Sequence, residues 1–447
     1  MMDADLIVRG AEIVTPAGLQ TADLVVAAGR IEYVGDASGY RAHEIVRADG
    51  QVLFPGCVDV HVHFNDPGRA DWEGLDSGSA ALAAGGGTCF ADMPLNSHPP
   101  VLDRTSFLAK RARAEALSCL DFALWGGLTP DSLPHLDAMA DEGAIGFKAF
   151  LCPSGIDEFG AADAFTLLQG MRCAAARGLI VGVHAEDPDF LASHHIRQPL
   201  PRPGTMRDWF ASRPPEAEVR AIELVCELAD ETGCAVHIVH VSSPEGLAAA
   251  LRGRSAGVDI SIETCHHYLL LDDEAGAAIG IAAKCAPPLR PRASVEALWA
   301  ALATGDIDTL GSDHSPAPPE MKSGADVFSA WGGIAGCQHG FPLVIDRAIR
   351  ESSWQRLAEV CALQPARRFK LGTKGGIALG MDADFILLDK HSSPIDAGSL
   401  LQRHPVSPYI GLRPGWRVAA TYLRGRPVGP QHRGNFLKPA KTPSTPT

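Results

Sequence analysis

The chain has 447 residues, of which 46% are hydrophobic and 21% are charged, and its 53 acidic residues against 39 Lys and Arg give a formal net charge of −14. This composition is typical of a globular protein with a large core and excludes wholesale disorder. The acidic balance disfavours nucleic acid and anionic membrane surfaces as partners.

The cysteines and the N-terminus indicate a cellular compartment. The chain has 11 cysteines, an odd number with no Cys-x-x-Cys pair, which favours reduced thiols over a disulfide framework or a thiolate zinc cluster. The first residues lack the basic start and the apolar stretch of a signal peptide, and no apolar run approaches the roughly 20 residues that span a bilayer. We therefore expect a cytoplasmic protein.

Short strands separated by turns are predicted at both ends of the chain. They fall at residues 6–9, 12–14, 23–26, 31–34, 377–379, 384–388 and 417–423. We expect residues 1–54 and 371–432 to pair as one small β-sandwich domain. The tail, residues 433–447, is expected to be disordered because its last ten residues offer too little apolar surface to pack.

Between these ends, short apolar runs typical of buried strands alternate with stretches long enough for helices, such as residues 216–232. The runs lie at residues 58–63, 88–93, 122–125, 145–150, 179–184, 235–240, 258–262 and 309–313. The alternation predicts a parallel sheet, and eight repeats predict a closed (β/α)8 barrel of the TIM type over residues 55–370. An open, doubly wound sheet is the alternative.

Candidate metal ligands fall at the ends of these strands. Strand side chains alternate faces, so His61 and His63 point to the same side and can bind one metal ion together. The ends of later strands carry further ionisable residues: Lys148, His184, His240 and Asp313. In a barrel these ends share one face, where active sites form. His237 is the rival to His240, because the two face opposite sides of one strand.

Lys148 is the most informative of these candidates. Its ammonium group would lie in an apolar strand, which is costly unless the amine is neutral or paired. A neutral amine can react with carbon dioxide to give a carbamate, an anion able to bridge two metal ions. Each candidate also has a purely structural interpretation, as a core histidine, a snorkelling lysine or a helix cap. For all of these structural interpretations to hold, the residues would have to fall at the same ends of different strands by accident, so a shared metal site is favoured.

The sequence resembles the cyclic amidohydrolases of the dihydroorotase, hydantoinase and allantoinase group over residues 5–430. The matching motifs lie at residues 55–63, 146–148, 183–186, 240–243, 263–265 and 311–314. The resemblance implies the same barrel and sandwich, with two divalent metal ions in each subunit. It implies that His61, His63 and Asp313 hold one ion, that His184 and His240 hold the other, and that Lys148, carbamylated to N6-carboxylysine, bridges them. Zinc is the expected metal, with iron, cobalt or manganese as alternatives.

Several segments are similar to allantoinases in particular, namely residues 63–69, 72–74, 93–97, 150–158 and 312–319. Dihydroorotase-like sequences carry an Arg where this chain has Asn65, so a charged substrate would lose a bidentate partner. The resemblance implies hydrolysis of allantoin, a small neutral cyclic ureide, to allantoate by a homotetramer. A hydantoinase or dihydropyrimidinase is the alternative; a dihydroorotase or a scaffold without activity is less favoured.

The expected roles of individual residues follow from this resemblance. Asp313 is expected to move the proton from the attacking water to the leaving ring nitrogen. Substrate contacts are expected from Cys152, Ala286, Ser315 and Gly333. Two positions depart from the usual pattern of the group. His266 stands where Pro is usual and is expected to be a neighbouring loop residue, and Ala286 stands where hydantoinases often have Ser.

Overall fold

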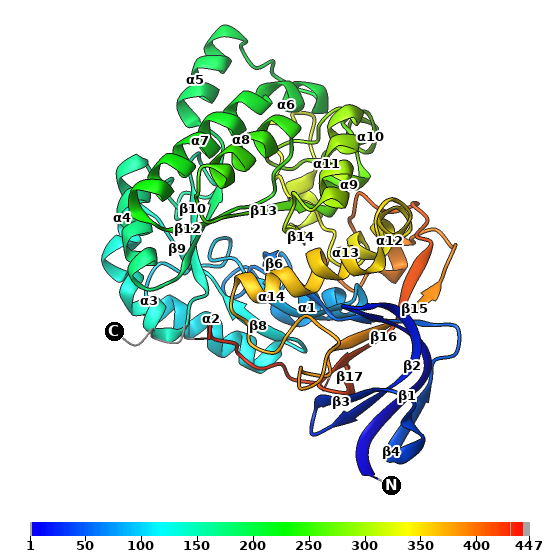
Figure 1. Ribbon diagram of the computed structural model, residues 1–447. Helices are drawn as coiled ribbons and strands as arrows, with labels where there is room; N and C mark the ends of the chain where they lie inside the picture. The colour runs from blue at the N-terminus through cyan, green and yellow to red at the C-terminus, as the bar shows by residue number, and fades with distance from the viewer. Residues whose placement is uncertain (1, 430, 441–447) are drawn as a thin grey trace.

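Both ends of the chain contribute strands to one sheet in the computed structural model, which describes residues 2–429 and 431–440. The strand order is β17-β16-β15-β5-β1-β2-β3, with β4 paired to β1. The bounds are β1 Met2–Thr15, β2 Gly18–Ala27, β3 Arg30–Gly35, β4 Tyr40–Arg47, β5 Val52–Pro55, β15 Phe385–Lys390, β16 Trp416–Leu423 and β17 Arg426–Pro427. The two ends meet where β5 and β15 pair antiparallel, with Leu53 opposite Leu387 (Figure 1).

Two details of this sheet differ from the prediction. Residues 6–9 and 12–14 belong to a single strand, β1, which has a bulge between Val8 and Ala11. Gly10 has a φ of 72° there, and a Cβ atom would come within 2.6 Å of Asp49 Oδ1. Residues 377–379 are not a strand: the amide of Gly380 donates to the carbonyl of Ile31, and Ile377 packs into the core of the sheet from an irregular segment.

A closed barrel of parallel strands lies beside the sheet and has a strand at each of the eight predicted runs. Its strands are β6 Cys57–Val62, β7 Gly87–Asp92, β8 Asp121–Leu124, β9 Gly126–Gly127, β10 Gly146–Phe150, β11 Ile180–His184, β12 Ala235–Ile238, β13 Ile260–Cys265 and β14 Thr309–Gly311. Trp125 separates β8 from β9, and β9 pairs with β10. Val62 forms a parallel bridge with His314, which closes the ring. The alternative of an open sheet is therefore wrong.

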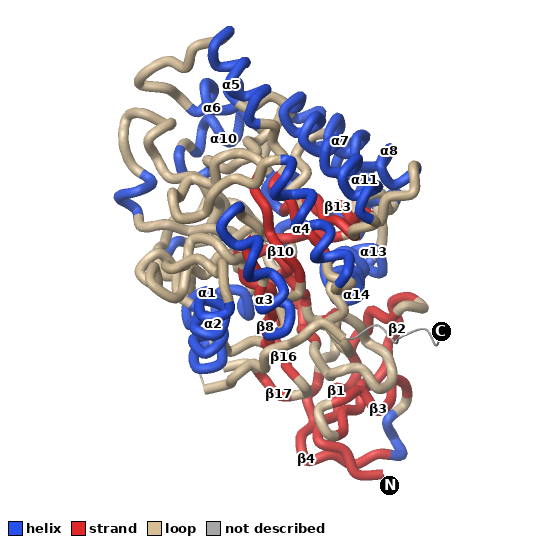
Figure 2. Tube along the Cα trace, turned by 90° about the vertical axis from the view of Figure 1, so that its left-hand side faces the viewer, coloured by secondary structure: helices blue, strands red, loops and turns tan. Residues whose placement is uncertain are grey.

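Helices surround the barrel strands, as Figure 2 shows. They are α1 Leu75–Ala84, α2 Arg104–Leu117, α3 Leu136–Glu142, α4 Ala164–Ala176, α5 Pro188–Arg197, α6 Met206–Ser212, α7 Pro215–Thr232, α8 Pro244–Ser255, α9 His266–Leu270, α10 Asp273–Ile279, α11 Arg292–Thr304, α12 Gly340–Glu351, α13 Trp354–Ala358 and α14 Gln364–Arg368. The predicted helix at 216–232 is α7, and it ends at Gly233, whose φ of 66° suits a left-handed cap. Within the described residues, none of the helices has the length and apolarity needed to cross a bilayer.

Part of the tail expected to be disordered is packed against the barrel. Phe436 forms a parallel bridge with Phe122 of β8, and the amide of Leu437 donates to the carbonyl of Phe122 over 2.7 Å. The rings of Phe436 and Phe122 lie 5.5 Å apart. Phe436 and Leu437 supply the packing surface that the last ten residues of the chain lack. The prediction of disorder was therefore wrong for residues 433–440. Residues 441–447 lie outside the described part of the chain.

Candidate active site

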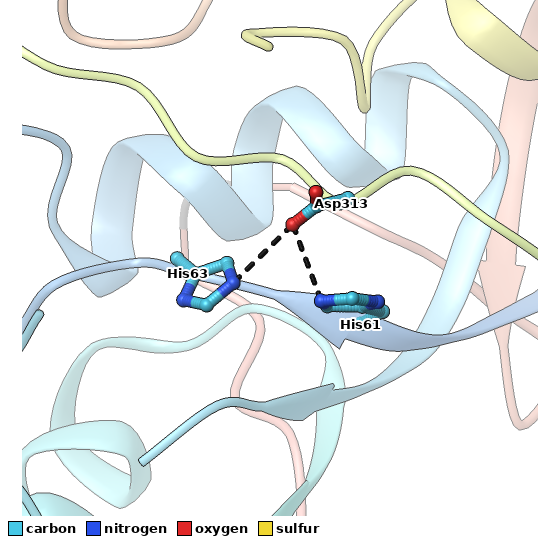
Figure 3. Close-up of side chains that lie close together, drawn as sticks. All are labelled: His61, His63 and Asp313. Atoms are coloured by element: carbon cyan, nitrogen blue, oxygen red, sulfur yellow. Dashed lines mark ion pairs between the residues drawn. The ribbon is translucent and has the colours of Figure 1, made fainter. Parts of the chain in front are cut away.

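His61, His63 and Asp313 converge at one end of the barrel. His61 lies on β6, His63 follows that strand directly, and both rings point to the same side, as the strand period requires (Figure 3). Asp313 follows β14, and its φ of 44° is rare for a residue other than glycine. The Oδ1 atom of Asp313 lies 3.2 Å from His61 Nε2 and 3.3 Å from His63 Nε2. Three donor atoms thus surround one small volume.

His184 and His240 form a second pair beside the first. His184 ends β11, His240 follows β12, and their ring centres lie 4.6 Å apart, while the rings of His240 and His61 lie 5.5 Å apart. His184 Nε2 lies 2.7 Å from Glu186 Oε2, and that carboxylate also accepts a 2.6 Å hydrogen bond from Arg213 Nη2. The carboxylate of Glu186 therefore sets the orientation of the His184 ring.

The buried carboxylate of Glu263, on β13, links the two pairs of histidines. Its Oε1 atom lies 2.6 Å from His61 Nδ1 and accepts a 3.1 Å hydrogen bond from the backbone amide of His240. His237 points the other way, toward Ser261 Oγ at 2.8 Å and Glu263 Oε2 at 3.4 Å. The structure thus brings His240, and not its rival His237, to the other candidate ligands.

Lys148 lies on β10 and is fully buried. Its Nζ atom has no hydrogen-bond partner among the described residues and lies 5.0 Å from the centre of the Phe150 ring. Burial lowers the pKa of Lys148 to about 8, although the charges of Asp313 and Glu263 oppose the shift. A substantial fraction of the amine is therefore neutral near physiological pH.

The six residues fit a centre of divalent metal ions. Lys148 Nζ is buried without a hydrogen-bond partner in the described structure, and such an atom is rare unless a further group satisfies it. Burial lowers the pKa of His63 to about 4, which keeps its imidazole neutral and able to coordinate. Imidazole and carboxylate ligands suit zinc, iron, cobalt and manganese alike.

A cavity of about 450 Å³ opens over these residues, and it is lined by His61, His63, His184, His240 and Asp313 together with loop residues. Of the expected substrate contacts, Ala286, Ser315 and Gly333 line the cavity. The hydroxyl of Ser315 has no hydrogen-bond partner within the described residues, so it is free to meet a ligand.

Gly333 is required at its position by close packing. A Cβ atom there would lie 2.2 Å from the carbonyl oxygen of Ser315, and the φ of 125° also excludes other residues. Its amide already donates to the carbonyl of Lys284 over 2.7 Å, and its carbonyl accepts from Lys322 Nζ over 2.6 Å. Gly333 therefore allows the cavity wall to close, and its carbonyl keeps one lone pair for a ligand.

Cys152 lies beside His184 and Glu186, and donor atoms of the three residues lie within 4.8 Å of one another. It is not among the residues that line the cavity; it is buried against Leu191 and Ala217, and its Sγ atom accepts a 3.4 Å hydrogen bond from Arg213 Nη2. The described structure thus gives Cys152 a place behind the wall, beside the Arg213–Glu186 pair. His266 was expected in a loop, but it is the first residue of helix α9; it is buried and is not among the residues that line the cavity.

Sequence reasoning assigned no role to several residues of the site. Glu186 and Glu263 fell within matching motifs, but nothing local showed that they hold His184 and His61. Arg213 and Lys284 line the cavity from loops that are distant in sequence from the ligands. A buried carboxylate at the end of a barrel strand is a signal that could have identified Glu263.

Comparisons with known proteins show which family the chain resembles. The model of the amidohydrolase family matches residues 52–428. An allantoinase of Rubrobacter xylanophilus is 47% identical over 98% of this chain and 98% of its own, and an allantoinase of Escherichia coli is 38% identical over 95% of each chain. Among solved structures, an L-hydantoinase (dihydropyrimidinase) from Arthrobacter aurescens has a TM-score of 0.92 and 31% identity, covering 97% of this chain and 100% of its own.

Proposed function

The chain belongs to the amidohydrolase family, and we propose from that premise that it hydrolyses the cyclic amide bond of allantoin to give allantoate. It is a hydrolase of cyclic amides that uses divalent metal. The observation that carries the proposal is the convergence of His61, His63 and Asp313 at one end of the barrel, beside His184 and His240. Relatives named allantoinase at 38% to 47% identity support the choice of substrate.

The proposed centre holds two divalent ions, zinc by preference. His61, His63 and Asp313 would hold one ion and His184 and His240 the other, with Lys148 as its carbamate between them. This arrangement is supported by the buried Nζ of Lys148, which has no partner in the described residues. When bound, two such ions lower the pKa of water toward about 7 and polarise a carbonyl group.

Asp313 moves the proton in this reaction. Its Oδ1 atom faces His61 and His63, which leaves Oδ2 to accept the proton of the attacking water. As the water oxygen bonds to the ring carbonyl carbon, the carbon–nitrogen bond breaks, and Asp313 delivers that proton to the leaving ring nitrogen. The products are a free ureido nitrogen, which has gained one proton of the water, and a carboxylic acid, which releases the other proton to solvent and becomes the carboxylate, so the atoms and protons balance.

The substrate is expected to be neutral. Asn65 is buried, and its amide donates to the carbonyl of Pro316, so it offers no cation at the position of the dihydroorotase arginine. Two cations line the cavity, Arg213 and Lys284: the charge of Arg213 is paired with Glu186, and burial lowers the pKa of Lys284 to about 8. We also propose that the enzyme is a homotetramer in the cytoplasm, where its 11 unpaired cysteines would stay reduced.

Parallel assays of ring opening test the proposal. The metal-loaded protein is given racemic allantoin, hydantoin, dihydrouracil and dihydroorotate, and each product is quantified. Turnover of allantoin far above that of the others is expected. Preference for hydantoin or dihydrouracil would instead make the chain a hydantoinase or dihydropyrimidinase with the same centre. No turnover of any of the four substrates would favour a scaffold.

A further inference from the structure

Lys284 occupies the wall of the cavity, on the segment between the short helix Ile281–Ala283 and Pro287. Its side chain is almost fully buried, and its Nζ atom lies 4.3 Å from the centre of the Trp209 ring. The ammonium group donates one hydrogen bond, to the carbonyl of Ala330. An ammonium group has three N–H donors, so two remain for a further partner.

No carboxylate among the described residues forms an ion pair with this ammonium group. Among the ion pairs of the described residues, none includes Lys284, and the nearby carboxylate of Asp326 pairs with Arg202. Arg213, the other cation of the cavity wall, already holds Glu186. Burial and the charge of Arg213 lower the pKa of Lys284 to about 8. A buried amine without a counter-ion destabilises the fold, so its position at a ligand cavity points to a role toward the ligand.

We propose that Lys284 determines specificity by donating a hydrogen bond to the carbonyl oxygen of the exocyclic ureido group of allantoin. This inference rests on the proposed function, in which allantoin is the substrate. Hydantoin has the same ring without the ureido substituent and therefore serves as the comparison. The aromatic face of Trp209 keeps the ammonium group in place without consuming its donors. A neutral ureido carbonyl is a strong acceptor, and it meets the charge-assisted donor without bringing a second charge into the cavity.

The test compares Lys284→Met with the parent enzyme on allantoin and on hydantoin, the latter followed as a substrate or as a competitive inhibitor. We expect kcat/KM for allantoin to fall by about 10- to 100-fold, the usual effect of losing a charge-assisted hydrogen bond. The constant for hydantoin is expected to stay within about threefold, because that ligand never reached the ammonium group. For Lys284→Gln, which retains an N–H donor, kcat/KM for allantoin should lie between the values of the parent enzyme and of Lys284→Met.

Lys322 offers a matched control. Its Nζ atom donates to the carbonyl of Gly333 in the same loop, but Lys322 is not among the residues that line the cavity. Lys322→Met removes the same charge and the same kind of loop contact. Lys322→Met is therefore expected to change kcat/KM for allantoin and the corresponding constant for hydantoin by the same factor. Metal content and circular dichroism show whether each variant is folded.

Three outcomes would overturn the proposal. Equal losses on both ligands in Lys284→Met would make Lys284 a structural anchor of the loop, and an unchanged constant for allantoin would remove it from recognition altogether. Both results leave the proposed function intact. A parent enzyme that opens hydantoin or dihydroorotate but not allantoin would instead overturn the proposed function and this inference with it. In that case, a loss confined to dihydroorotate in Lys284→Met would assign the ammonium group to a carboxylate.

Discussion

His61 Nδ1 and Glu263 Oε1 lie 2.6 Å apart, fully buried beneath the cavity. Burial opposes ionisation of Glu263, but His61 and His237 outweigh it and hold the pKa of that carboxyl well below its ordinary value. An ionised Glu263 accepts a hydrogen bond from the protonated Nδ1 of His61, which leaves a free lone pair on His61 Nε2, the atom that faces Asp313. The carboxylate of Glu263 thus sets the tautomer of His61. It also fixes the position of His240, because it accepts a hydrogen bond from the backbone amide of that residue.

Replacement of Glu263 is expected to weaken metal binding. In Glu263→Gln the neutral side-chain amide replaces the charged acceptor of His61 Nδ1 and of the His240 amide. Loss of a carboxylate that orients a metal ligand typically lowers metal affinity by about 10- to 100-fold. Chelator competition followed by metal analysis measures the change. Asp121→Asn, which alters another buried carboxylate far from the histidines, is the control and should retain the metal. Equal affinity in Glu263→Gln and the parent would contradict the orienting role.

Asp313→Asn is expected to lose turnover far more than metal. Losing a positioned proton acceptor costs about 10²- to 10⁴-fold in rate, whereas an amide oxygen can still coordinate. The expected signature is a protein with most of its metal and almost no ring opening, measured on one preparation. Turnover near that of the parent would show that another group carries the proton.

Metal removal tests the carbamate on Lys148. The apoprotein, prepared with a chelator and depleted of carbon dioxide, is expected to regain activity with added metal several-fold faster when bicarbonate is present, since the neutral amine must first react with carbon dioxide. Lys148→Met cannot form the carbamate and should show no such dependence. Reconstitution of the parent at the same rate with and without bicarbonate would argue against the bridging carbamate.

The candidate ligands could be predicted because strand geometry is local. Alternation along β6 places His61 and His63 on one side, and parallel order brings the ends of β10, β11, β12 and β14 to one face. His240 was preferred to His237 because it comes at the end of its strand, and in the structure His237 faces Ser261 and Glu263.

The remainder of the site depends on contacts between distant segments. Nothing in the sequence near Cys152 showed that Arg213, from the loop before α7, would cover it. The connection after β14 folds back so that Ala330 meets Lys284 and Gly333 packs on Ser315, and no local periodicity specifies that path. The packing of Phe436 on Phe122 likewise depends on the folded barrel, in which β8 pairs with β7 on one side and Phe122 bridges Phe436.

The lowered pKa of Lys284 predicts a specific pH dependence of stability. Between pH 8 and about 10.4, the ordinary value for lysine, the folded chain binds fewer protons at this residue than the unfolded chain does. The contribution of Lys284 therefore makes the free energy of unfolding rise with pH across this window. The difference in unfolding free energy between the parent and Lys284→Met, measured in denaturant at several pH values, should shift in favour of the parent as pH rises. A difference independent of pH would mean that the amine titrates normally.

Lys374 is expected to be a main contributor to the stability of the junction between the barrel and the sheet. Its buried Nζ atom pairs with Asp121 of β8, with Asp384 at 2.7 Å and with Asp382 at 2.9 Å, and Asp121 also pairs with Arg424. The three carboxylates resemble a metal site, but the ammonium group already occupies their centre.

Lys374→Met would leave these carboxylates close together without their common cation. Breaking a buried pair on one side typically costs about 3 to 5 kcal/mol, because the remaining charge stays buried and unpaired. We expect a loss of that size in the free energy of unfolding, measured by denaturant titration, while ring opening by the folded fraction stays unchanged because the network contains none of the candidate ligands. Lys370→Met, a change at a partly exposed lysine whose Nζ atom donates to the carbonyl of Gly178 and not to a buried carboxylate cluster, is the comparison and should cost far less. A loss no larger than that of Lys370→Met would mean that water and Arg424 can neutralise the three carboxylates without Lys374.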